Sequence, residues 1–258
     1  MSNPRAPRTS FNISQQTMQE ISQAISKDPS LLFHIPMARR LITIERLREY
    51  SKNGIALVDK QDEAVIDQAA EYNVKQLGRL SGLDRPQFII DVLPSIWPLY
   101  HRIPDAKVLC VGPRCENEFL MLLAKGFRPE NIRGLDLISY SEFVDLGDMH
   151  DMPYEDDAFD VVFLGWVLGY SRDCQKAANE TIRVTKPGGY VAVGVERPVD
   201  QTLGVSDGDQ GIDGTYFYGV DELIALFDGH VRDVPFRSDD HPSLKGQLTH
   251  LMTIMELG

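Results

Sequence analysis

Residues that could bind a nucleotide-like ligand begin in the segment KVLCVGPRCENEF, which spans Lys107 to Phe119. Its pattern predicts a buried strand, a turn at Gly112 and the start of a helix. A glycine in such a turn lets the backbone approach a ligand closely, and the free N–H groups of the following helix can face an anion such as a carboxylate. Gly112 would serve equally well as a plain strand-to-helix turn, so this segment alone does not decide between the two interpretations.

An acidic residue ends the next apolar segment. Asp136, in the sequence GLDL, follows Gly112 by 24 residues (136 − 112) and stands at the end of a second predicted strand. In nucleoside-binding α/β folds, a carboxylate in this position accepts hydrogen bonds from ribose hydroxyls. The alternative is an aspartate that only caps a helix. The spacing favours a ligand contact, in which the adjacent Leu137 would take part.

The segment LGDMHDMPYEDDAFDVVFLGWVLGY adds further polar and aromatic candidates. Asp148 follows a short strand, where it could accept a hydrogen bond from an adenine amino group while Met149 packs on the ring. Gly165 and Trp166 follow the apolar run FDVVFL, at the carboxyl end of another strand. The alternative interpretation makes Met149 and Trp166 core residues and His150 a surface histidine.

Short apolar runs that alternate with helical segments must position these residues. Strands are predicted at residues 107–111, 131–135, 143–146, 159–164, 190–195, 231–237 and 250–257. Helices are predicted at residues 116–125, 173–184 and 221–227. This alternation predicts an α/β fold with a doubly wound, mostly parallel sheet, Rossmann-like, whose last two strands form an antiparallel pair. In such a sheet the ligand lies beyond the carboxyl ends of the strands.

The chain divides by composition into three regions. Residues 1–12 are rich in Pro, Ser and Arg and are expected to form a disordered tail. Residues 13–103 are expected to form an α-helical N-terminal region that covers the ligand site as a lid. Residues 104–258 form the α/β domain, in which the Gly- and Asp-rich segment 197–219 is expected to be a functional or mobile loop.

The N-terminal region contains an amphipathic helix in the sequence MARRLITIERLREY. Its apolar residues form one stripe and its charged residues lie opposite: Met37, Leu41, Ile44 and Leu47 against Arg39, Arg46 and Glu49. Residues 61–80 continue in the same style. Trp97 and Tyr100 follow, and they either face a substrate or fill the seam between the lid and the α/β domain.

Composition excludes several classes of function. The 258 residues are 43% hydrophobic and 25% charged, which predicts a packed core. The net charge of −12 disfavours nucleic acid and anionic membranes as partners, and no apolar run is long enough to span a membrane. The three cysteines have no CxxC spacing, which fits a reducing compartment and predicts neither a disulfide framework nor a metal site. We therefore expect a cytoplasmic protein with a small-molecule partner, of unspecified oligomeric state.

The segments GLDL, LGDMHDMPYEDDAFDVVF and RVTKPGGYVAVG, in this order and spacing, resemble the class I S-adenosylmethionine-dependent methyltransferases, above all their small-molecule branch. That branch has a glycine loop after its first strand, an acid ending the second, a GD…LPF…D..FD block and an R-x-L-K-P-G-G turn. The resemblance covers residues 106–196, a little over a third of the chain. It implies S-adenosyl-L-methionine as the cofactor and a methyltransferase-like domain over residues 104–258.

The resemblance also implies roles for single residues. These are Gly112 at the methionine part of the cofactor, Asp136 at the ribose, Asp148 and Met149 at the adenine, Gly165 and Trp166 near the sulfonium and the mouth of the substrate site, and a structural turn at Lys186–Gly189.

The first block departs from the family pattern. Cys110 stands where the family has an acid, and Arg114 and Glu116 stand where it has glycines. Arg114 could bind the cofactor carboxylate in a bidentate pair, and Glu116 or Glu118 could bind the amino group that the missing acid would have held. Alternatively, Arg114 and Glu116 pair with each other at the rim and contribute little.

Methyl transfer from a sulfonium is an in-line displacement, so it needs a general base only where the acceptor must first lose a proton. The candidates for that base are His150, Glu196, Tyr170 and, on weaker grounds, His101. The resemblance implies a methyltransferase acting on an unidentified small molecule. The alternative is a non-catalytic, methyltransferase-like binding protein with a degenerate loop. A nicotinamide-dependent oxidoreductase would require G-x-G-x-x-G at Gly112, which is absent.

Overall fold

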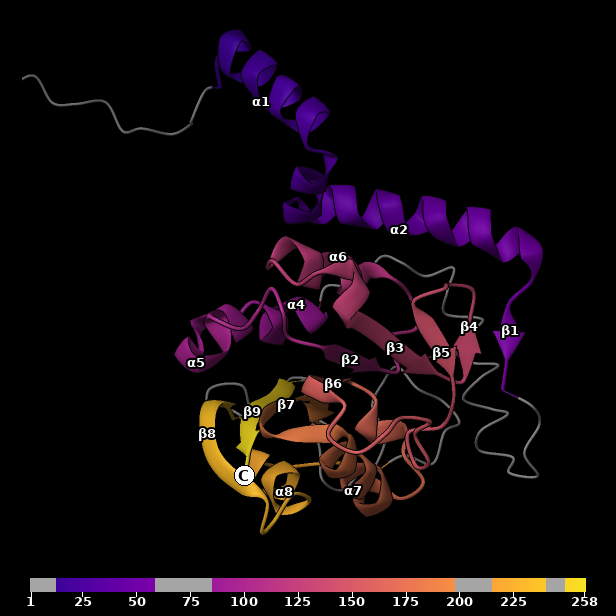
Figure 1. Cartoon of the computed structure of the whole chain (residues 1–258), viewed down its shortest axis with the longest axis vertical. Coiled ribbons are helices and arrows are strands. Elements are labelled where there is room, and N and C mark those ends of the chain that lie inside the picture. The colour runs from indigo at the N-terminus through magenta and orange to yellow at the C-terminus, as the bar shows by residue number, and fades with distance from the viewer. Residues whose placement is uncertain (1–12, 59–84, 198–214, 240–248) are drawn as a thin grey trace, which may run out of the picture.

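A seven-stranded sheet is the centre of the protein. The computed structural model describes residues 13–58, 85–197, 215–239 and 249–258. The strand order across the sheet is β5-β3-β2-β6-β7-β9-β8 (Figure 1). Its strands are β2 (Val108–Val111), β3 (Ile132–Asp136), β5 (Val144–Leu146), β6 (Phe159–Gly165), β7 (Thr185–Arg197), β8 (Val231–Ser238) and β9 (Thr249–Leu257).

The sheet has the predicted doubly wound, mostly parallel architecture. Strands β5, β3, β2, β6 and β7 are parallel, and β9 pairs antiparallel with both β7 and β8. The chain builds outward from β2 to β3 and β5, then returns to place β6 and β7 on the other side of β2. The strand order therefore reverses at β2, and ligands of such sheets bind beyond the carboxyl ends at this reversal.

Strand β7 begins earlier than the sequence pattern predicts. Thr185 already pairs with Phe159, and the next pair joins Tyr190 to Val161, so the four residues between them loop out of the ladder. Gly188 in this loop has a φ of +71°, a conformation that glycine adopts without steric cost. The Lys-Pro-Gly-Gly turn is thus a bulge inside the strand and not a break before it.

Helices cover both faces of the sheet. The helices are α1 (Gln15–Lys27), α2 (Pro36–Tyr50), α4 (Arg85–Ile90), α5 (Trp97–Tyr100), α6 (Asn117–Ala124), α7 (Cys174–Val184) and α8 (Val220–Ala225). Short 3-10 turns occur at Pro29–His34, Ser51–Asn53, Leu93–Ser95, Pro129–Asn131 and Leu168–Tyr170. No helix of the described residues is long and apolar enough to cross a membrane.

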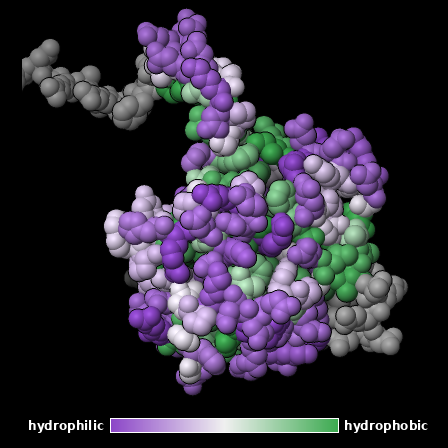
Figure 2. All heavy atoms as spheres, in the orientation of Figure 1, coloured by the Kyte–Doolittle hydropathy of each residue, from purple (hydrophilic) through white to green (hydrophobic). Residues whose placement is uncertain are grey.

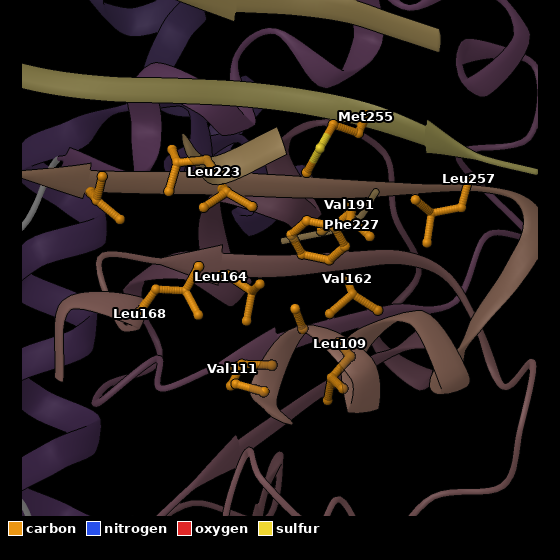
Figure 3. Close-up of a cluster of buried hydrophobic side chains, with 14 of the residues drawn as sticks. Leu109, Val111, Val162, Leu164, Leu168, Val191, Leu223, Phe227, Met255 and Leu257 are labelled. Atoms are coloured by element: carbon orange, nitrogen blue, oxygen red, sulfur yellow. The ribbon is translucent and has the colours of Figure 1, made fainter. Parts of the chain in front are cut away.

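Alternate residues of each strand point to opposite faces, and this divides the core in two. Leu109 and Val111 join the cluster under α7 and α8, where Figure 3 shows them on the same side of the sheet as Phe227. Val108 and Cys110 join the cluster under α4 and α6. Strands that are apolar on both faces are what a parallel sheet covered by helices requires.

The N-terminal region is helical, as predicted, with one short strand that the pattern did not indicate. Helix α2 lies across α6, and α1 extends away from the body of the protein (Figure 1) without burying any residue. Strand β1 (Ala56–Leu57) pairs antiparallel with β4 (Ile138–Ser139). The predicted tail 1–12, the helical segment 61–80 and most of the loop 197–219 lie outside the described residues.

The fully buried residues of helix α2 are polar. Arg39 and Thr43 are buried, whereas Met37 and Leu41 are 70% and 61% exposed. The Arg39 guanidinium donates to the Phe33 carbonyl and to the Gln87 side chain, at 2.7 Å each. The first half of the apolar stripe therefore faces outward, whereas Leu47 near its end packs against a small buried cluster. Figure 2 shows apolar surface around the N-terminal helices.

The aromatic residues after α4 lie away from the carboxyl ends of the strands. Trp97 and Tyr100 are 68% and 50% exposed and stack on each other, so they fill no seam. Arg102, next to His101, donates to the Gly188 carbonyl at 3.1 Å, and Gly188 belongs to the bulge that precedes the paired part of β7. This segment lies at the opposite, amino edge of the sheet, so the predictions that placed it at the ligand site are wrong.

Candidate functional site

Three predicted site residues lie side by side at the edge where the parallel strands end, here named the carboxyl edge. Val111 of β2 pairs with Leu135 of β3 and with Leu164 of β6. The residues that follow these three are Gly112, Asp136 and Gly165, and they therefore stand at one level across the central strands. The spacing-based prediction that these segments converge agrees with this geometry.

The loop after β2 is held in an unusual backbone conformation. Gly112 has a φ of +66°, and Arg114 adopts a φ of +53°, which side chains other than glycine rarely do. A Cβ added at Gly112 would come within 2.6 Å of the Val167 side chain. Glycine is thus required at position 112, while Arg114 occupies a left-handed position that glycine would fill without strain.

Asp136 at the end of β3 anchors this loop. Its carboxylate accepts hydrogen bonds from the backbone N–H groups of Arg114 at 2.9 Å and Ile138 at 3.4 Å. Burial raises the pKa of Asp136 to about 6 despite these bonds. Each carboxylate oxygen can accept a second hydrogen bond, so Asp136 can still receive a ligand hydroxyl.

Glu116 is engaged by the N-terminal region. The Arg46 guanidinium of α2 binds both of its carboxylate oxygens, and the Ser141 hydroxyl donates to Oε1 at 2.5 Å. Arg46 also lies 4.7 Å from the centre of the Tyr50 ring. Glu116 therefore pairs with Arg46 and not with Arg114, which corrects the rim-pair alternative. The carboxylate fastens α2 to the loop instead of standing free for a ligand.

Asp148 belongs to a buried polar chain. Its Oδ1 accepts from the His150 backbone N–H at 2.9 Å and contacts His150 Nδ1 at 2.5 Å, and its Oδ2 lies 2.9 Å from Arg172. His150 Nε2 is 2.7 Å from the Ser171 hydroxyl. Burial raises the pKa of Asp148, but the His150 hydrogen bonds and the Arg172 charge outweigh it and lower the pKa to about 2. His150 is buried, so its interpretation as a surface histidine is wrong.

The remaining predicted neighbours are in or near the core. Met149 is half-buried and packs against the core cluster under α7. Gly165 has no room for a Cβ, which would come within 2.5 Å of the Phe163 ring. The Leu137 carbonyl accepts the Val58 N–H at 2.9 Å, beside the small β1–β4 sheet. Tyr170 ends the 3-10 turn after β6 and is half-buried.

Trp166 follows β6 in a left-handed conformation, with a φ of +57°. Its backbone N–H donates to the Gly194 carbonyl at 2.7 Å, and its indole N–H donates to His250 Nδ1 at 3.2 Å. The indole packs on Gly194 so closely that a Cβ there would come within 2.9 Å of the ring. Trp166 is thus both buried, as the alternative interpretation held, and placed at the carboxyl edge, as the functional one required.

Around Trp166, the predicted candidate Glu196 is joined by Arg85 and His250, which the sequence did not single out. Glu196 near the end of β7 forms an ion pair with Arg85 of α4, and the Arg85 guanidinium lies 5.6 Å from the Trp166 ring centre. Glu196 stands opposite His250 in the β7–β9 ladder. Burial and the charge of Arg85 lower the pKa of His250, so its imidazole is neutral at pH 7. A single arginine and a single histidine outside any motif carry no signal that sequence reasoning could use.

The donor set at the carboxyl edge suits an organic ligand. Within the described residues no cluster of three or more His, Cys, Asp or Glu side chains could hold a metal ion. Backbone N–H groups, the carboxylate of Asp136 and the guanidinium of Arg114 can bind hydroxyls and carboxylates. Trp166 offers an aromatic wall beside them.

Comparison with protein families locates a known domain in this region. Residues 121–193 match the family model of a methyltransferase domain. Over 89 residues, or 34% of the chain, the sequence is 35% identical to an uncharacterized methyltransferase of Schizosaccharomyces pombe, covering 31% of that protein. Over 64 residues, or 24% of the chain, it is 39% identical to the demethylmenaquinone methyltransferase of Desulfitobacterium hafniense, covering 24% of it. The matched segments thus span about a third or less of these relatives.

A solved structure with a similar fold extends the likeness over most of the chain. The 1,6-didemethyltoxoflavin-N1-methyltransferase of Burkholderia thailandensis, crystallised with 1,6-didemethyltoxoflavin and S-adenosylhomocysteine, superposes with a TM-score of 0.53. The superposition covers 79% of this chain and 94% of that structure, at 17% sequence identity. At this identity the comparison establishes the fold.

Proposed function

We propose that this chain, which has the fold of the class I S-adenosylmethionine-dependent methyltransferases, transfers a methyl group from S-adenosyl-L-methionine to a small molecule. The observation that carries the proposal is the convergence of Gly112, Asp136 and Trp166 at the carboxyl edge, where the strand order reverses. The methyltransferase domain matched over residues 121–193 supports the same activity. The fungal and bacterial relatives are methyltransferases by name.

The residues present fit such a cofactor. Gly112 leaves the backbone bare where the ligand would pass, and Asp136 has lone pairs left for the ribose hydroxyls. Among the described residues, no hydrogen bond or ion pair occupies the guanidinium of Arg114, which can therefore bind the cofactor carboxylate in a bidentate pair. Asp148 would meet the adenine only through lone pairs left over from His150 and Arg172.

When bound, the cofactor supplies a sulfonium that makes the methyl group ready for displacement. The chain's own contribution is then to align the acceptor with the methyl group and to exclude water. Trp166 is suited to this role because its backbone and indole hydrogen bonds fix the ring at the carboxyl edge. Positioning of this kind can lower a barrier by roughly 7–11 kcal/mol in favourable cases.

The groups near Trp166 limit the chemistry of the acceptor. The indole N–H is only a donor, so His250 Nδ1 must accept, and the imidazole proton then sits on Nε2. His250 can donate to an acceptor molecule but is a poor base while this bond persists. Glu196 is already engaged in an ion pair with Arg85. We therefore expect an acceptor that reacts as an anion or as a soft nucleophile, without losing a proton to the protein.

A binding measurement tests the cofactor. Calorimetric titration of the full chain with S-adenosyl-L-homocysteine is expected to show one site, and Asp136→Ala should weaken it at least about tenfold, the loss of one to two good hydrogen bonds. The matched control is Asp151→Ala, an exposed aspartate in the next loop. The absence of any heat, and of any thermal shift with millimolar cofactor, would overturn the proposal.

Turnover separates an enzyme from a non-catalytic binding protein of the same fold. Incubation with S-adenosyl-L-methionine carrying a labelled methyl group, against pooled small-molecule extracts, should yield labelled product. Cofactor binding without transfer to any pool would favour the non-catalytic alternative.

We further expect the protein to reside in the cytoplasm, because its three cysteines are free and two of them are buried.

A further inference from the structure

The carboxylate of Glu118 is the least explained group at the carboxyl edge. Glu118 is the second residue of α6 and is 5% exposed. Its Oε2 has no hydrogen-bond partner among the described residues. A buried carboxylate that lacks a partner is costly, so proteins keep one mainly where something else binds it.

The surroundings of Glu118 carry opposite charges in close proximity. Burial raises the pKa of Glu118 well above the ordinary glutamate value, and the Asp136 charge adds to this. The positive charges of Arg114 and Arg85 and a hydrogen bond from the Cys110 thiol act in the other direction. Cys110, Arg114 and Asp136 lie at or next to the ends of β2 and β3. Arg85 lies beside Trp166, which follows β6. Glu118 therefore lies among polar groups of the carboxyl edge and not in a purely apolar interior.

Arg114 and Glu118 are a basic and an acidic side chain that lie near each other without forming an ion pair. No ion pair joins them among the described residues, although Arg114 is close enough to shift the Glu118 pKa. Arg114 lies in the loop that follows Gly112, and Glu118 lies in the first turn of α6. A guanidinium beside an acidic side chain with one unpartnered oxygen complements a molecule that carries a carboxylate and an ammonium group on neighbouring atoms. An α-amino acid is such a molecule.

We propose that Glu118 binds the α-ammonium group of the amino-acid part of the cofactor while Arg114 binds its α-carboxylate. This inference rests on the proposed function and deepens it. It also accounts for the cysteine at position 110, near the end of β2, where the resemblance predicts an acid. The acidic group comes instead from Glu118 in the first turn of α6, which accepts a hydrogen bond from the Cys110 thiol. It also gives the two glutamates different roles: Glu116 binds Arg46, and Glu118 would bind the ligand.

Two ligands that differ only in the amino-acid part provide the test. S-adenosyl-L-homocysteine carries the ammonium and carboxylate groups, and 5′-methylthioadenosine lacks both. Glu118→Gln keeps the shape of the side chain and removes its charge. We expect the dissociation constant of S-adenosyl-L-homocysteine to rise at least about tenfold in this variant, as loss of a charge-assisted hydrogen bond implies. The dissociation constant of 5′-methylthioadenosine should change less than about twofold.

The control variant is Glu130→Gln, which removes an exposed glutamate far from the site and should leave both constants unchanged. Equal weakening of both ligands by Glu118→Gln, or no weakening of either, would show a structural role and overturn the inference. If the unaltered chain binds neither ligand, the proposed function itself fails, and the inference fails with it. Binding of 5′-methylthioadenosine as tight as that of S-adenosyl-L-homocysteine would leave the function standing and contradict the amino-acid contacts alone.

A second measurement needs no variant and applies if Glu118→Gln does not fold. The deaminated analogue of S-adenosyl-L-homocysteine keeps the carboxylate and lacks only the ammonium group. The unaltered chain is expected to bind it at least about tenfold more weakly, for the same loss of a charge-assisted bond. Equal affinity for the two compounds would contradict a role for Glu118 in holding the ammonium group.

Discussion

Arg114 and Trp166 are the residues in which local strain and the candidate site coincide. Both have left-handed backbone angles although neither is glycine, and they follow β2 and β6 on either side of the site. Such conformations cost of order 1–3 kcal/mol and persist where surrounding structure enforces them. The Arg114 N–H bond to Asp136 and the Trp166 N–H bond to Gly194 supply that enforcement. Asp157, also left-handed, stands in an exposed turn away from the site.

Arg114→Gly is expected to stabilise the fold and weaken the cofactor. Removing the left-handed side chain should raise the free energy of unfolding by about 1 kcal/mol, and losing the guanidinium should weaken S-adenosyl-L-homocysteine at least about tenfold. Denaturant titration and calorimetry measure the two effects. Asp157→Gly is the control, with a similar gain in stability and unchanged binding. Unchanged affinity in Arg114→Gly would rule out the carboxylate contact.

Cofactor affinity should depend on the protonation of Asp136. Its pKa in the folded chain is about 6, raised by burial from 3.8, so the folded state gains stability from protonation below pH 6 and loses it as the pH rises through 6. Under the proposed function, binding has the opposite preference, because the ribose hydroxyls would donate to the ionised carboxylate. We expect the dissociation constant of S-adenosyl-L-homocysteine to rise up to about tenfold per unit as the pH falls below 6.

The measurement is calorimetry between about pH 5 and about pH 7 at fixed ionic strength, roughly one unit either side of the pKa. Asp136→Asn should bind weakly and show a flat profile over the same range. A pH dependence that survives in Asp136→Asn would assign the titration to a different group.

At the scale of elements, α2 is attached by charge and hydrogen bonds. Its buried side chains are Arg39 and Thr43, and Arg46 reaches Glu116 at the start of α6. The apolar residues Met37 and Leu41 face outward. An amphipathic pattern shows which residues share a face, but it does not say which face packs when arginines find buried partners.

Breaking the pair between α2 and α6 should destabilise the protein. Arg46→Met leaves the Glu116 carboxylate buried without its cation, which typically costs about 3–5 kcal/mol for a buried pair and somewhat less here, since Arg46 is partly exposed. The double variant Arg46→Met/Glu116→Gln should recover much of the loss. Denaturant titration of the unaltered chain, Arg46→Met, Glu116→Gln and the double variant gives the coupling energy.

The opposite face of α2 provides the comparison. Met37→Gln and Leu41→Gln should change the free energy of unfolding by no more than about 0.5 kcal/mol, as surface substitutions do. Losses of several kcal/mol from these two, with none from Arg46→Met, would mean that the apolar face is the one that packs.

At the scale of the whole molecule, the net negative charge of the chain disfavours the binding of polyanions such as nucleic acids. The chain carries 38 acidic and 26 basic residues, a net charge of −12. Several arginines at or near the site are already committed to carboxylates: Arg46 to Glu116, Arg85 to Glu196 and Arg172 to Asp148. Little positive potential then remains to attract a phosphate backbone, which supports a small molecule as the substrate.

The full chain should not bind nucleic acid. In a gel-shift experiment at low salt, where phosphate contacts are strongest, neither duplex DNA nor transfer RNA is expected to be retarded at micromolar protein. A buffer series of rising salt is the control, since any residual electrostatic binding should vanish along it. Retardation that persists at physiological salt would point to a nucleic acid substrate instead.

The sequence alone determined the order of the strands and helices that build the seven-stranded sheet. Buried parallel strands are short apolar runs, and glycine or proline marks their ends, so local patterning predicted the strands, the doubly wound sheet and its antiparallel end. Spacing from Gly112 identified Asp136 in the same way, because each strand end lies at the same edge of the sheet. These signals are local or periodic, and a single chain displays them.

Only the tertiary structure decided which side chains meet. Arg46 and Glu116 are 70 residues apart, and Trp166 and His250 are 84 apart. A lone arginine or histidine has no periodicity, so nothing in the sequence announces its partner. The inward polar face of α2 and the unpaired carboxylate of Glu118 follow from the same cause. Local chemistry sets what a segment can form, whereas partners in a folded chain depend on packing between segments that are distant in sequence.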